Sequence, residues 1–255
     1  MELADIPYVG AGVAASALGM DKALMKKVFQ QDGLPVVEYL VVKRRDWEAD
    51  PEGTIRRIEA KFSYPCFIKP SDLGSSVGIT KAHDRQELGL GLREAALYAR
   101  KLLVEEAING REIECSVLGN DSPIASVPGE IVPCNEFYDY AAKYLDDRSE
   151  VIIPAALPLE TTRPIQELAV RAFLALDCAG MARVDFFLEG GTGEVYVNEL
   201  NTIPGFTPIS MYPKLWEASG LSYPELIDRL IELALERYRD KSRSRTSYCS
   251  TAHGG

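Results

Sequence analysis

Histidine is scarce in this sequence, with only His83 and His253 among 255 residues. A Ser-His-Asp triad or a histidine-ligated metal site is therefore close to excluded by number alone. Long apolar runs are also missing, because none approaches the ~20 residues of a membrane span, and the acidic start lacks the apolar core of a signal peptide. Basic charge is in deficit: 28 Lys and Arg face 38 Asp and Glu, so nucleic acid is a poor general partner.

Cysteine is present, but its spacing shows no recognisable disulfide or metal-binding pattern. The five cysteines include no C-x-x-C pair, and their number is odd. This pattern predicts reduced, mostly buried thiols of a cytoplasmic protein. The hydrophobic fraction of 46% over 255 residues is typical of a globular chain with one or two domains.

Hydrophobic periodicity alternates between helices and short strands along most of the chain, which indicates an α+β (α/β) fold. Helices are expected over 22–31, 52–62, 85–100, 162–177 and 223–238. Strands are expected over 6–10, 36–42, 66–69, 79–82, 102–105, 112–118, 181–188 and 194–201. Residues 128–150 show no usable period and suggest a functional lid loop.

Two carboxylates and an amide are predicted to meet on a β-hairpin. Pairing across its five-residue loop puts Arg183 opposite Glu199, so Arg183, Asp185, Glu199 and Asn201 would share one face of the ribbon. Diagonal neighbours on such a ribbon lie within about 7–8 Å, and oxygen donors suit Mg²⁺ or Mn²⁺. The alternative is an exposed sheet face that carries an ordinary Arg–Glu pair.

Three further segments could contact a phosphate or a nucleoside. Lys69 precedes the small-residue loop 70–78, whose backbone N–H groups and serine hydroxyls can surround an anion, although the Walker A spacing is absent. The strand end Glu105–Glu106 could accept hydrogen bonds from an adenine or a ribose. The pair Lys143–Tyr144 could close over phosphates. Taken singly, each segment is better explained as a solvated loop or a charged strand end.

Taken together and in order, these segments resemble the ATP-grasp superfamily and, within it, the D-alanine–D-alanine ligases. The resemblance covers about residues 1–238. It rests on Met20-Asp21-Lys22, Ile68-Lys69-Pro70, Gly74-Ser75-Ser76-Val77-Gly78, Ala142-Lys143-Tyr144, Arg183-Val184-Asp185, Asn198-Glu199-Leu200-Asn201-Thr202 and Pro204-Gly205-Phe206-Thr207. It implies an ATP-grasp fold in which two subdomains clasp ATP.

The resemblance also implies roles for individual residues. The residues expected to bind ATP are Lys22, Lys69, Ser75, Ser76, Glu105, Glu106, Ile108, Glu112 and Lys143. The expected ligands of two Mg²⁺ (or Mn²⁺) ions are Asp185, Glu199 and Asn201. Substrate binding is expected from Arg183, Gly205, Ser210 and Met211, and catalysis from Ser75, Tyr144, Arg183 and Ser210.

The implied function is ATP-dependent ligation of two D-alanine molecules through an acyl phosphate, in the cytoplasm and for peptidoglycan synthesis. A D-alanine–D-lactate or D-serine ligase is an alternative, which Tyr144 would discriminate. A chain that binds nucleotide without ligation is another. The partners expected are D-alanine and ATP, with no nucleic acid and no membrane.

The resemblance implies the following division of the chain. We expect a linker at 1–20, a central subdomain at 21–105, a C-terminal subdomain with metal site and lid at 106–240, and a disordered tail at 241–255. The family carries an amino-terminal domain that anchors the first D-alanine, and this chain begins where that domain would end. We therefore expect Mg-ATP binding with little or no dipeptide formation, and an exposed edge that favours a homodimer.

Overall fold

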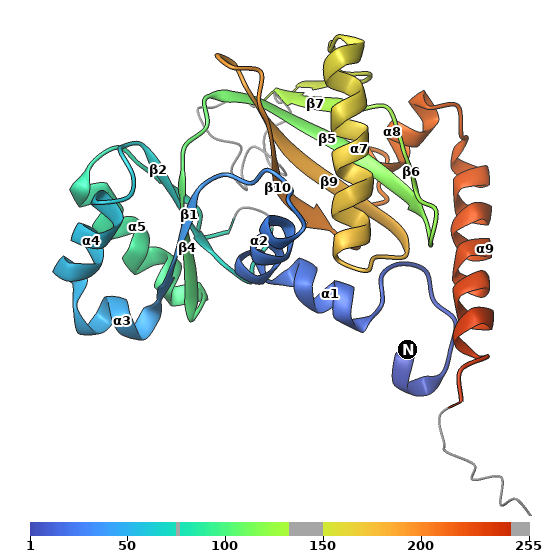
Figure 1. Ribbon diagram of the computed structural model, residues 1–255, viewed down its shortest axis with the longest axis horizontal. Coiled ribbons are helices and arrows are strands. Elements are labelled where there is room, and N and C mark those ends of the chain that lie inside the picture. Colours follow the sequence, from blue (N-terminus) through green and yellow to red (C-terminus); the bar gives the residue numbers. More distant parts are fainter. Residues whose placement is uncertain (75–76, 133–149, 246–255) are drawn as a thin grey trace, which may run out of the picture.

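The computed structural model describes residues 1–74, 77–132 and 150–245. Within these ranges the chain forms two antiparallel sheets, each covered by helices and placed side by side (Figure 1). The chain passes from the smaller sheet to the larger one between Glu106 and Gly110. An α+β fold was expected, and it is confirmed.

The smaller sheet has the strand order β1-β4-β2-β3. Its strands are β1 (Tyr39–Lys43), β2 (Cys66–Pro70), β3 (Thr80–Ala82) and β4 (Lys101–Glu106). Its helices are α3 (Arg44–Ala49), α4 (Pro51–Glu59) and α5 (Arg85–Tyr98). Buried Ile58, Ile68, Leu88 and Leu92 are part of its core. Asp84 caps α5, as its sequence predicts, by accepting a hydrogen bond from the Glu87 backbone N–H.

The larger sheet has the order β10-β9-β5-β7-β8, with β6 beside β5. Its strands are β5 (Gly110–Gly119), β6 (Ile124–Ala125), β7 (Gly129–Val132), β8 (Glu150–Ile152), β9 (Gly180–Glu189) and β10 (Val195–Asn201). Its helices are α7 (Leu159–Ala175), α8 (Met211–Ala218) and α9 (Tyr223–Lys241). The two long central strands, β5 and β9, pair along their whole length.

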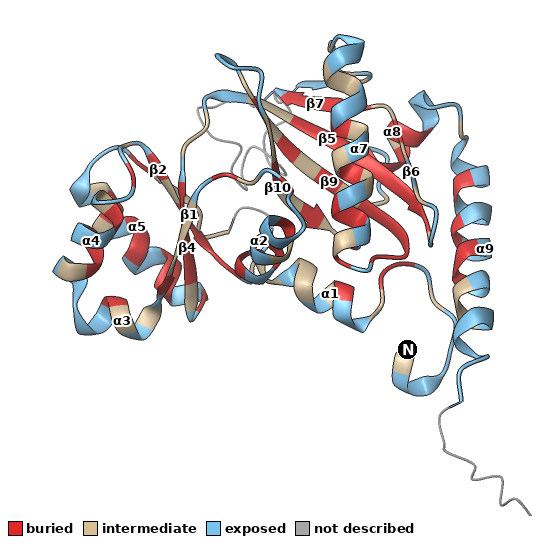
Figure 2. Ribbon diagram, viewed as in Figure 1, coloured by how far each residue is buried: buried red, intermediate tan, exposed pale blue. Residues whose placement is uncertain are grey.

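The two faces of β9 are used differently. Val184 and Phe186 belong to the core shared with α7, and Figure 2 shows buried positions alternating with intermediate ones along β9. On the other face, Met181 packs in the cluster formed with α8 and α9. Further along that same face the apolar pattern gives way to Arg183 and Asp185, because alternate residues of a strand point the same way. One face of β9 thus packs in the core, and the other changes from apolar to polar along the strand.

Helix α2 (Lys22–Gln31) lies between the two sheets. Asp21 caps it by accepting hydrogen bonds from the backbone N–H groups of Ala23 and Leu24, which is the N-cap that the sequence predicts. Met25 and Phe29 are buried in the core of the larger sheet. Helix α2 therefore contacts both sheets. The division into subdomains at 21–105 and 106–240 stays a prediction.

Several expectations about local structure are wrong. Residues 6–10 form no strand, and the glycine- and alanine-rich segment after them forms α1 (Val13–Met20), preceded by the short 3-10 helix Glu2–Ala4. Helices α3 and α8 were not predicted, because six to eight residues give too little periodicity. Part of the expected lid is the regular strand β7, whereas 133–149 lie outside the described residues.

The cysteines in the described ranges are buried and free, as expected. Burial raises the pKa of Cys66 to about 11 and that of Cys115 to about 12. Cys134 and Cys249 lie outside these ranges. In the described part of the chain, no helix is both long and apolar enough to cross a membrane.

Candidate functional site

The hairpin β9–β10 brings its polar residues together, but in a register that differs from the predicted one. Glu199 lies opposite Asp185, and Asn201 lies opposite Arg183, so the expected Arg183–Glu199 pairing is wrong. Two shifts of one residue each cause this difference: at the loop Leu188 pairs with Val195, one residue later than the predicted register requires, and a β-bulge between Val197 and Glu199 inserts one further residue into β10. Because of this insertion Glu199 faces the cavity, while Val197 on the other side of the bulge is buried in the core.

Arg183 and Asp185 form a two-pronged ion pair. Nε and Nη2 of Arg183 donate to the two carboxylate oxygens of Asp185 at 2.7 and 2.8 Å, and Glu114 on β5 lies 3.0 Å from the same Nε. The Asn201 side chain donates to Asp185 Oδ2 at 3.0 Å. Burial alone would lower the pKa of Arg183, but the charges of Asp185 and Glu114 hold it above its ordinary range. The guanidinium is therefore a permanent, oriented cation.

Asp185, Glu199 and Asn201 fit a hard divalent cation by the chemistry of their donors. They offer carboxylate and amide oxygens, which Mg²⁺ and Mn²⁺ prefer. In the described residues, no three His, Cys, Asp or Glu side chains are grouped so that they could hold a metal ion. The candidate metal ligands are therefore two carboxylates and one amide. Arg183 and Lys22 now contact these carboxylates, which shows that the site favours positive charge.

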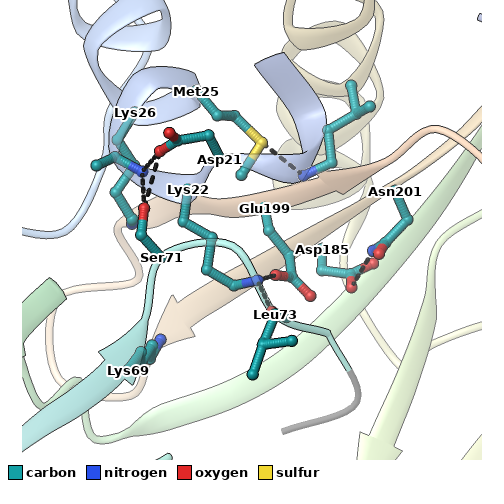
Figure 3. A network of polar contacts seen from close by, with 12 residues as sticks. Asp21, Lys22, Met25, Lys26, Lys69, Ser71, Leu73, Asp185, Glu199 and Asn201 are labelled. Atoms are coloured by element: carbon teal, nitrogen blue, oxygen red, sulfur yellow. Dashed lines mark hydrogen bonds and ion pairs between the residues drawn. The ribbon is translucent and has the colours of Figure 1, made fainter. Parts of the chain in front are cut away.

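Two lysines approach the same region from the other side. Lys22 Nζ lies 3.1 Å from Glu199 Oε2 and donates to the Leu73 carbonyl oxygen at 2.8 Å, so it joins β10 to the loop after β2 (Figure 3). Burial would lower the pKa of Lys22, but the nearby carboxylate of Glu199 holds it above its ordinary value. Lys69, at the end of β2, also faces the cavity. Both lysines are therefore placed to meet an anion.

A buried ion-pair cluster lies behind Lys69. Lys69 Nζ donates to Glu105 Oε2 at 2.6 Å, and Lys26 Nζ on α2 lies 3.0 Å from Glu105 Oε1. Burial would raise the pKa of Glu105, but the two ammonium groups outweigh it and lower the pKa to about 2. The carboxylate of Glu105 therefore pairs with two lysines, and its expected role at the adenine stays a prediction.

The first turn of α2 is fixed to both sheets. Asp21 accepts a hydrogen bond from Ser71 Oγ at 2.8 Å and pairs with Lys101 in the smaller sheet. Met25 Sδ accepts a hydrogen bond from the backbone N–H of Leu200 at 3.3 Å, between two of the metal candidates on β10. Figure 3 shows the contact between Ser71 and Asp21 and the position of Met25 near Lys22. The first turn of α2 is thus held to both sheets, and it carries Lys22, which contacts Glu199.

A cavity of about 660 Å³ lies between the two sheets. It is lined by seven of the predicted residues, namely Lys22, Lys69, Glu105, Glu106, Ile108, Glu112 and Glu199. Phe67, Ile79, Ile131 and Phe187 add apolar walls. A smaller hollow beside it is lined by Glu112, Glu114, Asp185, Asn198 and Glu199. The structure therefore gathers the phosphate and nucleoside candidates and Glu199 around one cavity, and Asp185 lines the hollow beside it.

Other predicted residues lie elsewhere or are not described. Gly205, Ser210 and Met211 do not line the cavity among the described residues. Ser210 Oγ accepts a hydrogen bond from the Thr207 backbone N–H at 2.9 Å, and Met211 packs with Ile131. Ser75, Ser76, Lys143 and Tyr144 lie outside the described residues.

Sequence reasoning missed four polar or sulfur-bearing residues of this region. Lys26, Met25, Glu114 and Asn198 each contact or line it. Lys26 follows Lys22 by one helical turn, a spacing that puts both on one face, so this signal was available. Asn198 lines the smaller hollow because of the β-bulge, and no local sequence pattern predicts that bulge.

Comparison with known proteins identifies relatives over nearly the whole chain. The family model described as "D-ala D-ala ligase C-terminus" matches residues 28–232. A D-alanine–D-alanine ligase of Acetivibrio thermocellus is 61% identical over 94% of this chain and 64% of that protein. One of Ruminiclostridium cellulolyticum is 59% identical over 96% of this chain and 66% of that protein. This chain thus spans about two thirds of the length of these relatives.

Two solved structures are also similar. The D-alanine–D-alanine ligase from Coxiella burnetii has a TM-score of 0.83 and 43% identity, covering 94% of this chain and 64% of that one. The VanG D-Ala:D-Ser ligase from Enterococcus faecalis has a TM-score of 0.83 and 42% identity, covering 91% and 66%. The similarity therefore includes ligases with different second substrates.

Proposed function

Because this chain belongs to the D-alanine–D-alanine ligase family, we propose that it carries the ATP- and metal-binding site of an enzyme that joins two D-alanine molecules. The observation that supports this most strongly is the arrangement around the 660 Å³ cavity. Lys22 and Lys69 enter it from one side, and Glu199 enters it from the metal-candidate hairpin on the other. A polyphosphate with its cation needs this combination of charges.

The nucleoside would occupy the part of the cavity with apolar walls. Phe67 and Phe187 can pack against a purine, and the strand end at Glu106–Ile108 offers backbone groups to its edge. Glu112 would accept hydrogen bonds from the ribose hydroxyls. Lys22 and Lys69 would then contact phosphate oxygens, with Ser75, Ser76 and Lys143 completing the set as the family resemblance implies.

The proposed reaction has two steps. The carboxylate of the first D-alanine attacks the γ-phosphorus of ATP, which gives an acyl phosphate and ADP. The amine of the second D-alanine attacks the acyl carbon, the amide bond forms, and inorganic phosphate leaves. The barriers fall mainly because charges and reacting groups are held in position.

The residues of this chain would orient and neutralise the reacting groups. Arg183, held by Asp185 and Glu114, would face the transferred phosphoryl group and the developing oxyanion. Asp185, Glu199 and Asn201 would hold Mg²⁺ or Mn²⁺, which supplies charge neutralisation on the phosphates. Gly205, Ser210 and Met211 would bind the second D-alanine, and Ser75 and Tyr144 would complete the hydrogen-bond network. Use of ATP and of peptidoglycan precursors suits a cytoplasmic enzyme.

The proposal is tested by incubating the chain with Mg-ATP and D-alanine and quantifying ADP and D-alanyl-D-alanine. One dipeptide for each ADP would show that the chain itself ligates. ADP release with little or no dipeptide, as expected from the sequence, would confine its function to nucleotide binding and hydrolysis, and release of neither product would contradict the proposed nucleotide site. Parallel reactions with D-lactate or D-serine test the alternative substrates, which the similarity to a D-Ala:D-Ser ligase makes a necessary comparison.

A further inference from the structure

Lys26 is a buried cation that does not reach the cavity. Its side chain is 1% exposed, and it is absent from the cavity walls, which include Lys22, Lys69 and Glu105. Its ammonium lies 3.0 Å from Glu105 Oε1 and 5.9 Å from the centre of the Tyr39 ring. Burying a charge is costly unless it is paired, so a lysine at this position needs a physical reason.

The reason lies in the sharing of one carboxylate by two ammonium groups. Glu105 contacts Lys26 through Oε1 and Lys69 through Oε2. Without Lys26, the pair Glu105–Lys69 would be neutral, and both carboxylate oxygens could turn toward Lys69. With Lys26 present and protonated, the cluster has a net charge of +1, and a single carboxylate oxygen contacts Lys69. Lys69 lines the cavity and Lys26 does not, so the excess positive charge faces the cavity at Lys69.

We infer that Lys26 is a positioning residue for phosphate binding, acting through Glu105 on Lys69. This inference rests on the proposed function, because it presupposes that a nucleotide polyphosphate occupies the cavity. Lys26 keeps the Glu105 carboxylate from cancelling the charge of Lys69 and fixes the carboxylate's orientation. It makes no contact with the nucleotide.

The test compares the affinities of Mg-ATP and of adenosine, which has no phosphates, in the full chain. Lys26→Met preserves side-chain length and removes the charge. We expect the Kd for Mg-ATP to rise by roughly tenfold or more, as for loss of a charge-assisted contact, while the Kd for adenosine stays within about twofold of the unaltered chain's. Lys27→Met is the matched control, because Lys27 is the next residue of the same helix and is exposed.

A double variant separates charge balance from packing. In Lys26→Met/Glu105→Gln the carboxylate charge is also removed, so Lys69 regains the excess positive charge. We expect Mg-ATP affinity to recover to within about threefold of the unaltered chain, with a thermal midpoint showing that each variant is folded. A purely structural role for Lys26 predicts no recovery.

The outcomes are distinct. Unchanged Mg-ATP affinity in folded Lys26→Met, equal losses for Mg-ATP and adenosine, or a double variant no better than the single one would each overturn the inference. If the unaltered chain binds neither ligand, the proposed function fails, and the inference fails with it.

Discussion

Removal of the charge on Glu105 should destabilise the folded chain in a pH-dependent way. Glu105→Gln leaves Lys26 and Lys69 buried without a compensating charge. A pKa lowered from 4.5 to about 2 corresponds to about 3 kcal/mol of stability at neutral pH. This agrees with the ~3–5 kcal/mol expected when one partner of a buried ion pair is removed.

The sign of the pH dependence follows from the direction of the shift. Because the pKa of Glu105 is lower in the folded chain, its stabilisation is complete above 4.5 and is lost as the pH falls toward about 2. Urea unfolding should therefore show a gap of about 3 kcal/mol between the two proteins at pH 7, closing as Glu105 is protonated.

A neighbouring carboxylate provides the control for this measurement. Glu106 is the next residue on β4 and is exposed, so Glu106→Gln should change the unfolding free energy by less than about 0.5 kcal/mol. A gap for Glu105→Gln below about 1 kcal/mol at pH 7, or one that does not change between pH 7 and pH 3, would refute the buried-cluster account.

Three other substitutions test separate parts of the structure. Glu199→Gln should raise the Kd for Mn²⁺, followed by electron paramagnetic resonance, by at least about tenfold; unchanged Mn²⁺ binding would remove Glu199 from the metal site. Gly110→Ala should lower the unfolding free energy by about 1–3 kcal/mol, because the added Cβ would lie 2.2 Å from the Leu188 carbonyl oxygen. Gly191→Ala, with open space around it, is the neutral control; equal stabilities would contradict the close approach of β5 to β9. Arg183→Lys keeps the charge but loses the two-pronged contact with Asp185. D-alanine-dependent ATP turnover should therefore fall by roughly tenfold or more. Full turnover would show that the orientation of this cation is unimportant.

Local sequence signals predicted the elements that carry the site. The Asp21 cap and the periodicity after it define α2, and the alternation in 181–188 defines β9, because both signals act within a few residues. The bulge in β10 was not predictable in the same way. It depends on pairing with β9, where Val197 must reach the core while Glu199 faces the cavity.

The buried cluster shows a second limit of sequence reasoning. Glu105 was assigned to the nucleoside because two adjacent acids end a strand near apolar residues. Its carboxylate instead pairs with lysines that lie 36 and 79 positions away in the chain, at 69 and 26. Such long-range pairing follows from the placement of α2 between the sheets, which periodicity does not specify. The family resemblance supplied the list of candidates, and the structure supplied the partners.

We propose that lysines from one side of the cavity and carboxylates from the other bind one magnesium nucleotide. Calorimetric titration of Mg-ATP into the unaltered chain tests this most directly, with Lys69→Met, Glu199→Gln and a titration in excess EDTA beside it. We expect one site per chain, whose affinity falls in all three comparisons. No binding, or binding that none of the three changes, would contradict it.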